Sequence, residues 1–84
     1  MKNTRHIMAR IESHFDSMTD LEKRIANYFL SPSSIYDDLS SQKVAQTLYI
    51  SQAALTRFAK KCGFKGYREF NFQYIHQLQS NVEE

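Results

Sequence analysis

The sequence predicts an all-α fold, a small bundle of about five helices. Apolar residues recur at helical spacing in several segments, and the two Gly and one Pro leave little material for the turns of a sheet. With 84 residues, of which 42% are hydrophobic and 24% charged, the chain has the size and composition of one globular domain. We therefore expect one domain over residues 1–80 and a linker or frayed tail over residues 81–84.

The first half of the chain predicts two helices. One covers residues 4–15, with Asn3 or Thr4 as its cap and a break at residues 17–18. The second begins at Thr19 and has Glu22 three residues later, which is the spacing of a capping box. It ends before Pro32, because the residue before a proline avoids helical backbone angles. The apolar positions of these two helices are Ile7, Met8, Ile11, Phe15, Leu21, Ile25, Tyr28 and Phe29.

The second half predicts three more helices. Residues 33–39 form a connector with room for one helical turn at 34–37, and Ser40 and Ser41 are both candidate caps for a helix over 42–48. Residues 49–50 make a tight turn, and Ser51 caps a helix over 52–62. Gly63 favours a left-handed stop there, after which Phe64 can fold back on the apolar face. The last helix covers residues 67–79, with one side formed by Phe70, Tyr74, Ile75 and Leu78.

Residues 41–62 have the pattern of a helix-turn-helix, a short helix and a longer one joined by a tight turn. Ala45 is small where the two helices must cross closely. Apolar residues stand where such a pair needs a shared core, at Val44, Leu48, Ile50, Leu55 and Phe58. The bundle is therefore expected to be homeodomain-like, without a wing.

The longer helix of this pair has two unlike faces. At 3.6 residues per turn, one face is apolar, formed by Leu55, Phe58, Ala59 and Cys62. The opposite face carries small or hydrogen-bonding residues first and cations later, an order that suits a recognition helix whose first turns meet base edges in the major groove. The predicted DNA-binding residues, including two serines at the helix starts, are Ser41, Ser51, Gln52, Ala53, Thr56, Arg57, Lys60 and Lys61. Lys60 and Lys61 lie further along the helix and are expected to meet phosphates.

The stretch over residues 50–70 resembles the N-terminal domain of the RpiR family of bacterial regulators. The matching elements are Ile50-Ser51 before the recognition helix, Arg57-Phe58 in its middle, Lys-x-Gly-Phe-x-Gly over 61–66, and Tyr67-Arg68-Glu69-Phe70. The segment over 19–32 also fits, so the resemblance covers roughly residues 7–78. It departs from the family pattern at Tyr49, where a small residue is usual, at Ala54 in place of Thr, and at Cys62 in place of Leu. The loss of Thr at position 54 removes one possible phosphate or base contact.

The resemblance implies a bacterial transcription regulator, more often a repressor than an activator. Such regulators bind double-stranded operator DNA through this domain and sense phosphosugars through a C-terminal sugar-isomerase-type domain. That second domain is absent from this sequence, so we expect the chain to be part of a longer protein that controls sugar-metabolism genes. We also expect the full-length protein to bind as a homodimer, because paired recognition helices suit two-fold symmetric half-sites.

Other functions fit the residues less well. The alternative is a helical dimerisation or protein-interaction module with an inert cationic face. An enzyme is not expected, because no nucleophile–base pair, metal cluster or nucleotide loop is evident. His6, His14 and His76 lack close metal-ligand spacing, and Asp37-Asp38 fits a solvated loop, so we expect no metal and no cofactor. The aromatics of the last third, Phe64, Tyr67, Phe70, Phe72 and Tyr74, are expected mostly in the core rather than stacking on bases.

The charge and cysteine content are consistent with a cytoplasmic DNA binder. The net charge is only +2, so affinity for DNA must come from where the charges lie. The single cysteine, Cys62, excludes an internal disulfide and suits a reducing cytoplasm. No stretch approaches the ~18 apolar residues that span a bilayer, so no membrane partner is expected.

Overall fold

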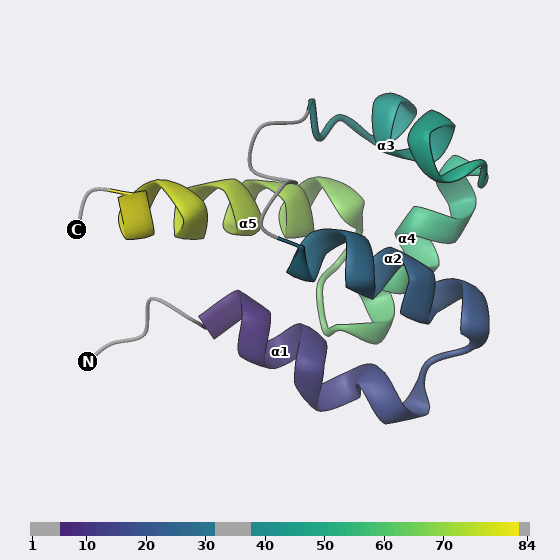
Figure 1. Ribbon diagram of the computed structural model, residues 1–84, viewed down its shortest axis with the longest axis horizontal. Coiled ribbons are helices and arrows are strands. Elements are labelled where there is room, and N and C mark those ends of the chain that lie inside the picture. The colour runs from purple at the N-terminus through teal and green to yellow at the C-terminus, as the bar shows by residue number, and fades with distance from the viewer. Residues whose placement is uncertain (1–5, 32–37, 83–84) are drawn as a thin grey trace.

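The computed structural model describes the chain over residues 6–31 and 38–82, and the side chains of residues 7–31 and 38–77. In these residues all regular structure is helical, in five α-helices and one 3-10 turn (Figure 1). The all-α prediction is therefore confirmed. The predicted caps Asn3 and Thr4, and the predicted turn over 34–37, lie outside the described residues.

The first two helices begin and end at the expected local signals. Helix α1 (His6–His14) continues into one 3-10 turn, η1 (Phe15–Ser17), and the extended backbone of Met18 then breaks the helix. Helix α2 (Asp20–Leu30) begins with the predicted capping box: Glu22 N–H donates to Thr19 Oγ1 at 3.2 Å, and Thr19 N–H donates to Glu22 Oε1 at 2.9 Å. It ends at Ser31, whose ψ of 136° is the extended conformation that a following proline favours.

The remaining helices differ from their predicted bounds by one to three residues. Helix α3 (Ser41–Leu48) is capped by Ser40, whose Oγ accepts from Lys43 N–H at 3.3 Å, so Ser41 is its first residue and not its cap. Helix α4 (Gln52–Lys61) is capped by Ser51, as predicted, and stops one residue early at Cys62. Helix α5 (Tyr67–Val82) runs three residues beyond its predicted end, because no Gly or Pro follows to stop it.

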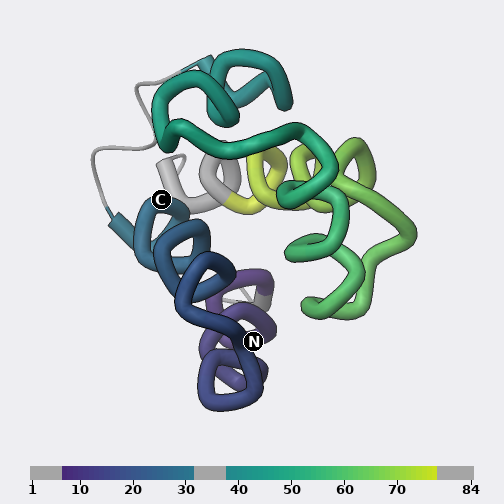
Figure 2. Tube along the Cα trace, turned by 90° about the vertical axis from the view of Figure 1, so that its right-hand side faces the viewer, coloured from purple at the N-terminus to yellow at the C-terminus, as the bar shows by residue number. Residues whose placement is uncertain are grey.

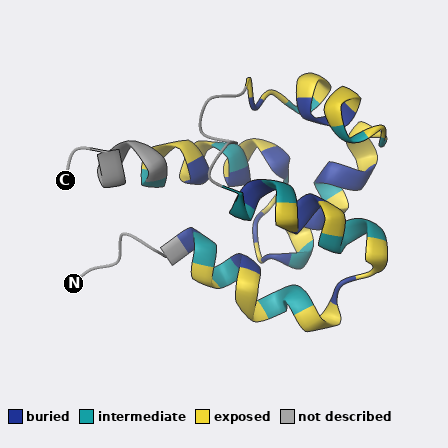
Figure 3. Cartoon of the chain, viewed as in Figure 1, coloured by how far each residue is buried: buried dark blue, intermediate teal, exposed yellow. Residues whose placement is uncertain are grey.

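An aromatic cluster joins α2, α4 and α5. The ring of Phe29 lies within 4.9–6.2 Å of the rings of Phe58, Tyr67, Phe70 and Tyr74, measured between centroids. Two buried hydroxyls close the polar ends of this cluster: Tyr67 donates to the carbonyl of Leu39 at 2.6 Å, and Tyr74 donates to the carbonyl of Phe29. Figure 3 shows the buried residues on the inward side of each helix.

The core prediction was right for most residues and wrong for a few. The aromatics of the last third are buried as expected, except Phe72, which is 68% exposed. In the helix-turn-helix, Val44, Ala45, Leu55 and Phe58 are buried. Leu48 and Ile50 were predicted to be buried with them but are only half-buried against the core, because they lie at the turn, where fewer neighbours surround them.

The helices place the α3–α4 pair at one end of the molecule. Helices α1 and α5 contact each other and lie one above the other in Figure 1, while α3 and α4 lie at the right and the last turn of α5 lies at the left. Figure 2 looks onto the end that α3 and α4 form. The end formed by α3 and α4 is therefore exposed to solvent, and the other helices pack behind it.

Candidate nucleic-acid interface

The turn between α3 and α4 is closed by two backbone hydrogen bonds. Tyr49 N–H donates to the carbonyl of Gln46 at 3.3 Å, and Ile50 N–H donates to the carbonyl of Ala45 at 3.0 Å. This pair of bonds requires a left-handed residue, and Tyr49 occupies that position with φ 59° and ψ 47°. A non-glycine residue is strained there. Ala45 is buried beside the turn and lets α3 approach α4 closely.

Helix α4 has a buried face and an exposed face, and most of the predicted binding residues lie on the exposed one. Leu55, Phe58 and Ala59 are fully buried. Thr56 is half-buried, and four predicted residues are exposed, namely Gln52, Ala53, Arg57 and Lys60. The exposed face carries no large apolar side chain. It can therefore offer hydrogen-bond donors and acceptors, methyl groups and positive charge to a polar partner.

Residue 54 is a packing position. Ala54 is only 3% exposed, so its side chain points into the core with Leu55 and not toward a ligand. The interpretation that Ala54 had lost a DNA contact is therefore wrong. In the sequence, position 54 falls between the two faces of the helix, and only the packing of neighbouring helices decides its side.

Two predicted serines lie at the starts of α3 and α4. Ser51 Oγ accepts from Ala54 N–H at 3.1 Å as the cap of α4. Ser41 Oγ donates to Gln52 Oε1 at 3.0 Å, which brings together two predicted site residues from different helices. This bond uses the carbonyl end of the Gln52 amide and leaves its two N–H donors directed elsewhere.

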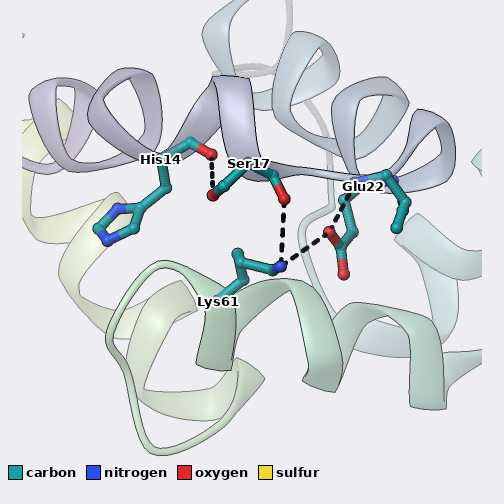
Figure 4. Close-up of polar contacts among 5 residues, drawn as sticks. His14, Ser17, Glu22 and Lys61 are labelled. Atoms are coloured by element: carbon teal, nitrogen blue, oxygen red, sulfur yellow. Dashed lines mark hydrogen bonds and ion pairs between the residues drawn. The ribbon is translucent and has the colours of Figure 1, made fainter.

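The adjacent lysines of α4 lie in different environments. Lys60 is exposed, whereas Lys61 is half-buried beside the segment between α1 and α2. The Lys61 Nζ donates to the carbonyl of Ser17 at 3.2 Å and lies 3.8 Å from Glu22 Oε1 (Figure 4). Glu22 Oε1 also belongs to the capping box of α2. Lys61 is thus the predicted site residue that the structure does not bring to the exposed face.

The C-terminal end of α4 is also held by an arginine, Arg10, which the sequence analysis did not single out. Arg10 Nη2 donates to the carbonyls of Cys62 at 3.2 Å and Gly63 at 3.0 Å, and its guanidinium lies 4.0 Å from the ring centroid of Phe64. A cation is favourable at the carbonyl end of a helix. Only the packing of α1 against this end reveals the role, because 52 residues separate Arg10 from Cys62.

The C-terminus of α4 also confirms the predicted glycine stop. Gly63 has φ 96°, its N–H donates to the carbonyl of Lys60 at 3.0 Å, and the N–H of Phe64 donates to the carbonyl of Ala59 at 3.0 Å. This is the Schellman arrangement, in which the residue after the glycine folds back. Phe64 does so and is buried.

Helix α5 adds two side chains beside the exposed face that the sequence reasoning missed. Arg68 and Asn71 line a hollow of about 410 Å³ together with residues of α3 and α4. Their spacing of three residues places them on one stripe of α5 and could have been noticed in the sequence. Which helix that stripe faces is decided only by the packing of α5.

The remaining reactive groups do not form a catalytic or metal centre in the described part of the chain. Cys62 is buried, and its burial raises the pKa of the thiol to about 11, which keeps it protonated and unreactive at neutral pH. Within residues 6–31 and 38–82, no three His, Cys, Asp or Glu side chains gather closely enough to hold a metal ion. None of the described helices combines the length and apolarity needed to cross a bilayer.

Comparison with known proteins agrees with this geometry. Residues 5–81 match the family described as the helix-turn-helix domain, rpiR family. A relative from Haemophilus influenzae, named as an uncharacterized HTH-type transcriptional regulator, is 32% identical over 78 residues, covering 93% of this chain and 27% of the relative. The HTH-type transcriptional regulator YfhH of Escherichia coli, also named as uncharacterized, is 29% identical over 76 residues, covering 90% of this chain and 27% of that protein.

The chain thus spans about a quarter of the length of these relatives. The family is a class of DNA-binding domains of transcription regulators, not of enzymes. The all-helical fold, the α3–turn–α4 unit and the match over nearly the whole chain therefore establish that this chain belongs to the rpiR family of helix-turn-helix domains.

Proposed function

We propose that α4 lies in the major groove of an operator duplex with its N-terminal half toward the bases. The observation that carries this proposal is the exposed face of α4, which has no apolar anchor and changes from small and hydrogen-bonding residues to cations along its length. Protein-binding surfaces usually have large apolar or aromatic anchors at their centre. Ala53 permits close approach and can touch a thymine methyl, and Thr56 can bind a base edge.

The hydrogen bond from Ser41 to Gln52 defines what Gln52 offers to a base. With its Oε1 accepting from Ser41, the amide presents its Nε2 donors to the groove. Because the Gln52 amide then offers only hydrogen-bond donors, it matches base edges that offer only acceptors there, which are guanine N7 and O6 or thymine O4. We therefore assign Gln52 a role as a base-reading donor, with Ser41 as the residue that positions it.

Phosphate contacts are assigned to the rest of the exposed set. Ser51 and the N-terminus of α4 can hold one phosphate, and Lys60 can reach another near the end of the helix. Arg57 lies in mid-helix, where its planar fork can grip a phosphate or a guanine. Lys61 we assign instead to anchoring the end of α4 against Ser17 and Glu22, since its ammonium is already bound there.

The wider role is proposed for the full-length protein. The relatives are named as transcriptional regulators and are nearly four times as long as the matched stretch, which leaves room for a further domain. We propose a homodimer that binds operator DNA in the bacterial cytoplasm. Its C-terminal part would sense a phosphosugar and thereby control the transcription of sugar-metabolism genes. We expect the protein to act on these genes as a repressor.

One experiment separates DNA recognition from the alternative of an interaction module without DNA specificity. The full-length protein is used to select bound sequences from random duplex DNA. We expect a two-fold symmetric motif, whose half-sites are each read by one α4. Recovery of unselected sequences, with no enrichment over input, would favour the interaction module and contradict the proposal.

A further inference from the structure

A polar hollow lies beside the exposed face of α4, where three helices meet. Its volume is about 410 Å³, and its lining comes from the start of α3, the first half of α4 and the first half of α5. The lining residues are Ser40, Ser41, Gln52, Thr56, Tyr67, Arg68 and Asn71. Helix α5 is not part of the helix-turn-helix, so the hollow extends the candidate interface to a third helix.

Most polar groups of this hollow already have partners within the protein. Ser40 caps α3, Ser41 donates to Gln52, and Thr56 donates to the carbonyl of Gln52 at 3.4 Å. The hydroxyl of Tyr67 donates to the carbonyl of Leu39 at 2.6 Å. These bonds fix the side chains that form the wall of the hollow.

Two side chains of α5 are left without partners. Arg68 is exposed, and within the described residues no group accepts a hydrogen bond from its guanidinium. Asn71 Oδ1 is buried and has no hydrogen-bond partner among those residues, which is costly for a polar atom. Asn71 lines the hollow, and the amide nitrogen at the other end of this side chain is the atom that can donate to an anion.

The hollow favours an anion. Its one charged lining group is the cation Arg68, and no carboxylate lines it. Of the two nearest acids along the chain, Asp38 accepts from the N–H of the lining residue Ser40 at 3.0 Å and Glu69 accepts from Lys65 N–H at 2.7 Å, and neither carboxylate is itself a lining group of the hollow. A guanidinium fork beside an amide donor matches the geometry of a phosphate group.

We propose that this hollow binds a backbone phosphate of the DNA duplex, with Arg68 as its charged ligand and Asn71 as its neutral donor. The proposal rests on the proposed placement of α4 in the major groove. With Gln52 and Thr56 at the bases, the α5 side of the hollow, where Arg68 lies, is the side that faces the sugar-phosphate backbone. The same chemistry would accept a free phosphate, and the experiment distinguishes the two sources.

The test uses the present chain, a duplex obtained by selection, and a scrambled duplex of the same length, across a KCl series. Arg68→Gln is expected to lower the affinity for both duplexes by a similar factor of about ten. It should also reduce the slope of log K against log salt by about 0.9, the value for one lost phosphate contact. Arg68→Lys should keep the slope, and Asn71→Asp should weaken binding more than Asn71→Ala, because it adds a negative charge.

Lys23→Gln is the matched control. It removes one positive charge from α2, where Lys23 Nζ lies 5.3 Å from the ring centroid of Phe15, away from the hollow. If Arg68→Gln has no larger effect than Lys23→Gln, the proposal is wrong. A change in sequence preference at constant slope would also overturn it, because Arg68 would then read a base.

Lys60→Gln separates a failure of this proposal from a failure of the proposed function. If Lys60→Gln reduces the salt slope of DNA binding and Arg68→Gln does not, only the proposed phosphate site in the hollow is wrong. If neither variant changes the slope, the proposed placement of α4 in the groove is wrong as well. The source of the phosphate is tested by the NMR signals of the Asn71 side-chain amide. Shifts caused by the duplex support the proposal, and shifts caused by inorganic phosphate at equal ionic strength, with none from the duplex, contradict it.

Discussion

The ammonium of Lys61 donates a hydrogen bond to the backbone carbonyl of Ser17, 44 residues earlier in the chain, at 3.2 Å. Its neighbour Lys60 is exposed. Two adjacent residues of the same type therefore have different environments, and each serves as the control for the other.

Lys61→Ala is expected to lower the free energy of unfolding by about 0.5–1 kcal/mol, because it removes a partly exposed ion pair and one hydrogen bond. It should leave the salt slope of DNA binding nearly unchanged. Lys60→Ala should leave stability unchanged and reduce the slope by about 0.9. Urea denaturation and a salt series measure both quantities, and the reverse assignment of the two effects would show that Lys61 leaves Ser17 to bind DNA.

The packing of the helix-turn-helix predicts unequal costs for two apolar truncations. Leu55 is fully buried between the helices, and Leu55→Ala should lower the free energy of unfolding by about 2–5 kcal/mol. Ile50 is half-buried at the turn, so Ile50→Ala should cost less. Both values come from chemical denaturation, and equal stability of Leu55→Ala and the unmodified chain would contradict this packing.

The two glycines near the end of α4 differ in their tolerance of a side chain. Gly63 has φ 96°, and a Cβ at this position would lie 2.6 Å from Arg10 Nη2. Gly63→Ala should therefore destabilise the domain by about 1–2 kcal/mol or more and displace Arg10 from the carbonyls of Cys62 and Gly63.

Gly66→Ala is the matched control, since a Cβ placed there meets no atom within 4 Å outside Gly66 and its two chain neighbours. This variant should have the stability of the unmodified chain or gain up to about 1 kcal/mol, because alanine restricts the unfolded chain. Thermal melts of the two variants give the comparison. Equal losses at both positions would mean that the left-handed backbone of Gly63 is not required.

The buried thiol predicts a loss of stability at alkaline pH. Burial raises the pKa of Cys62 from 9.0 to about 11, and burial also raises the pKa of Tyr67. Above pH 9 the unfolded chain therefore loses protons that the folded chain still binds, so the free energy of unfolding falls as pH rises from about 9 to about 11. Denaturation across this range should show the fall, and it should be smaller in Cys62→Ala, because the contribution of the thiol is then absent.

Much of the fold could be predicted from the sequence because its signals are local. Four signals each depend on a few neighbouring residues: the capping box of Thr19 and Glu22, the helix end at Ser31, the cap at Ser51 and the left-handed Gly63. The helical period also placed Leu55 and Phe58 in the core.

The errors in the site have a different origin. Ala54 and Lys61 both lie near the border between a buried and an exposed face of α4, and the helical period does not decide such positions. Their sides depend on which helix packs alongside: the rest of the core covers Ala54, and the α1–α2 segment binds Lys61. Arg10 was missed because it binds the end of another helix, and Arg68 was missed because only the packing of α5 places it beside residues of α3 and α4.

The orientation of α4 in the groove is the central claim, and one comparison tests it most directly. Binding of Gln52→Ala and Lys60→Ala is measured on the selected duplex and on the scrambled duplex across a salt series. Gln52→Ala should weaken binding mainly to the selected duplex, by about 1–3 kcal/mol, with little change in salt slope. Lys60→Ala should weaken both duplexes equally and reduce the slope by about 0.9. If the Lys60 variant instead alters sequence preference while the Gln52 variant alters only the slope, the proposed orientation of α4 is wrong.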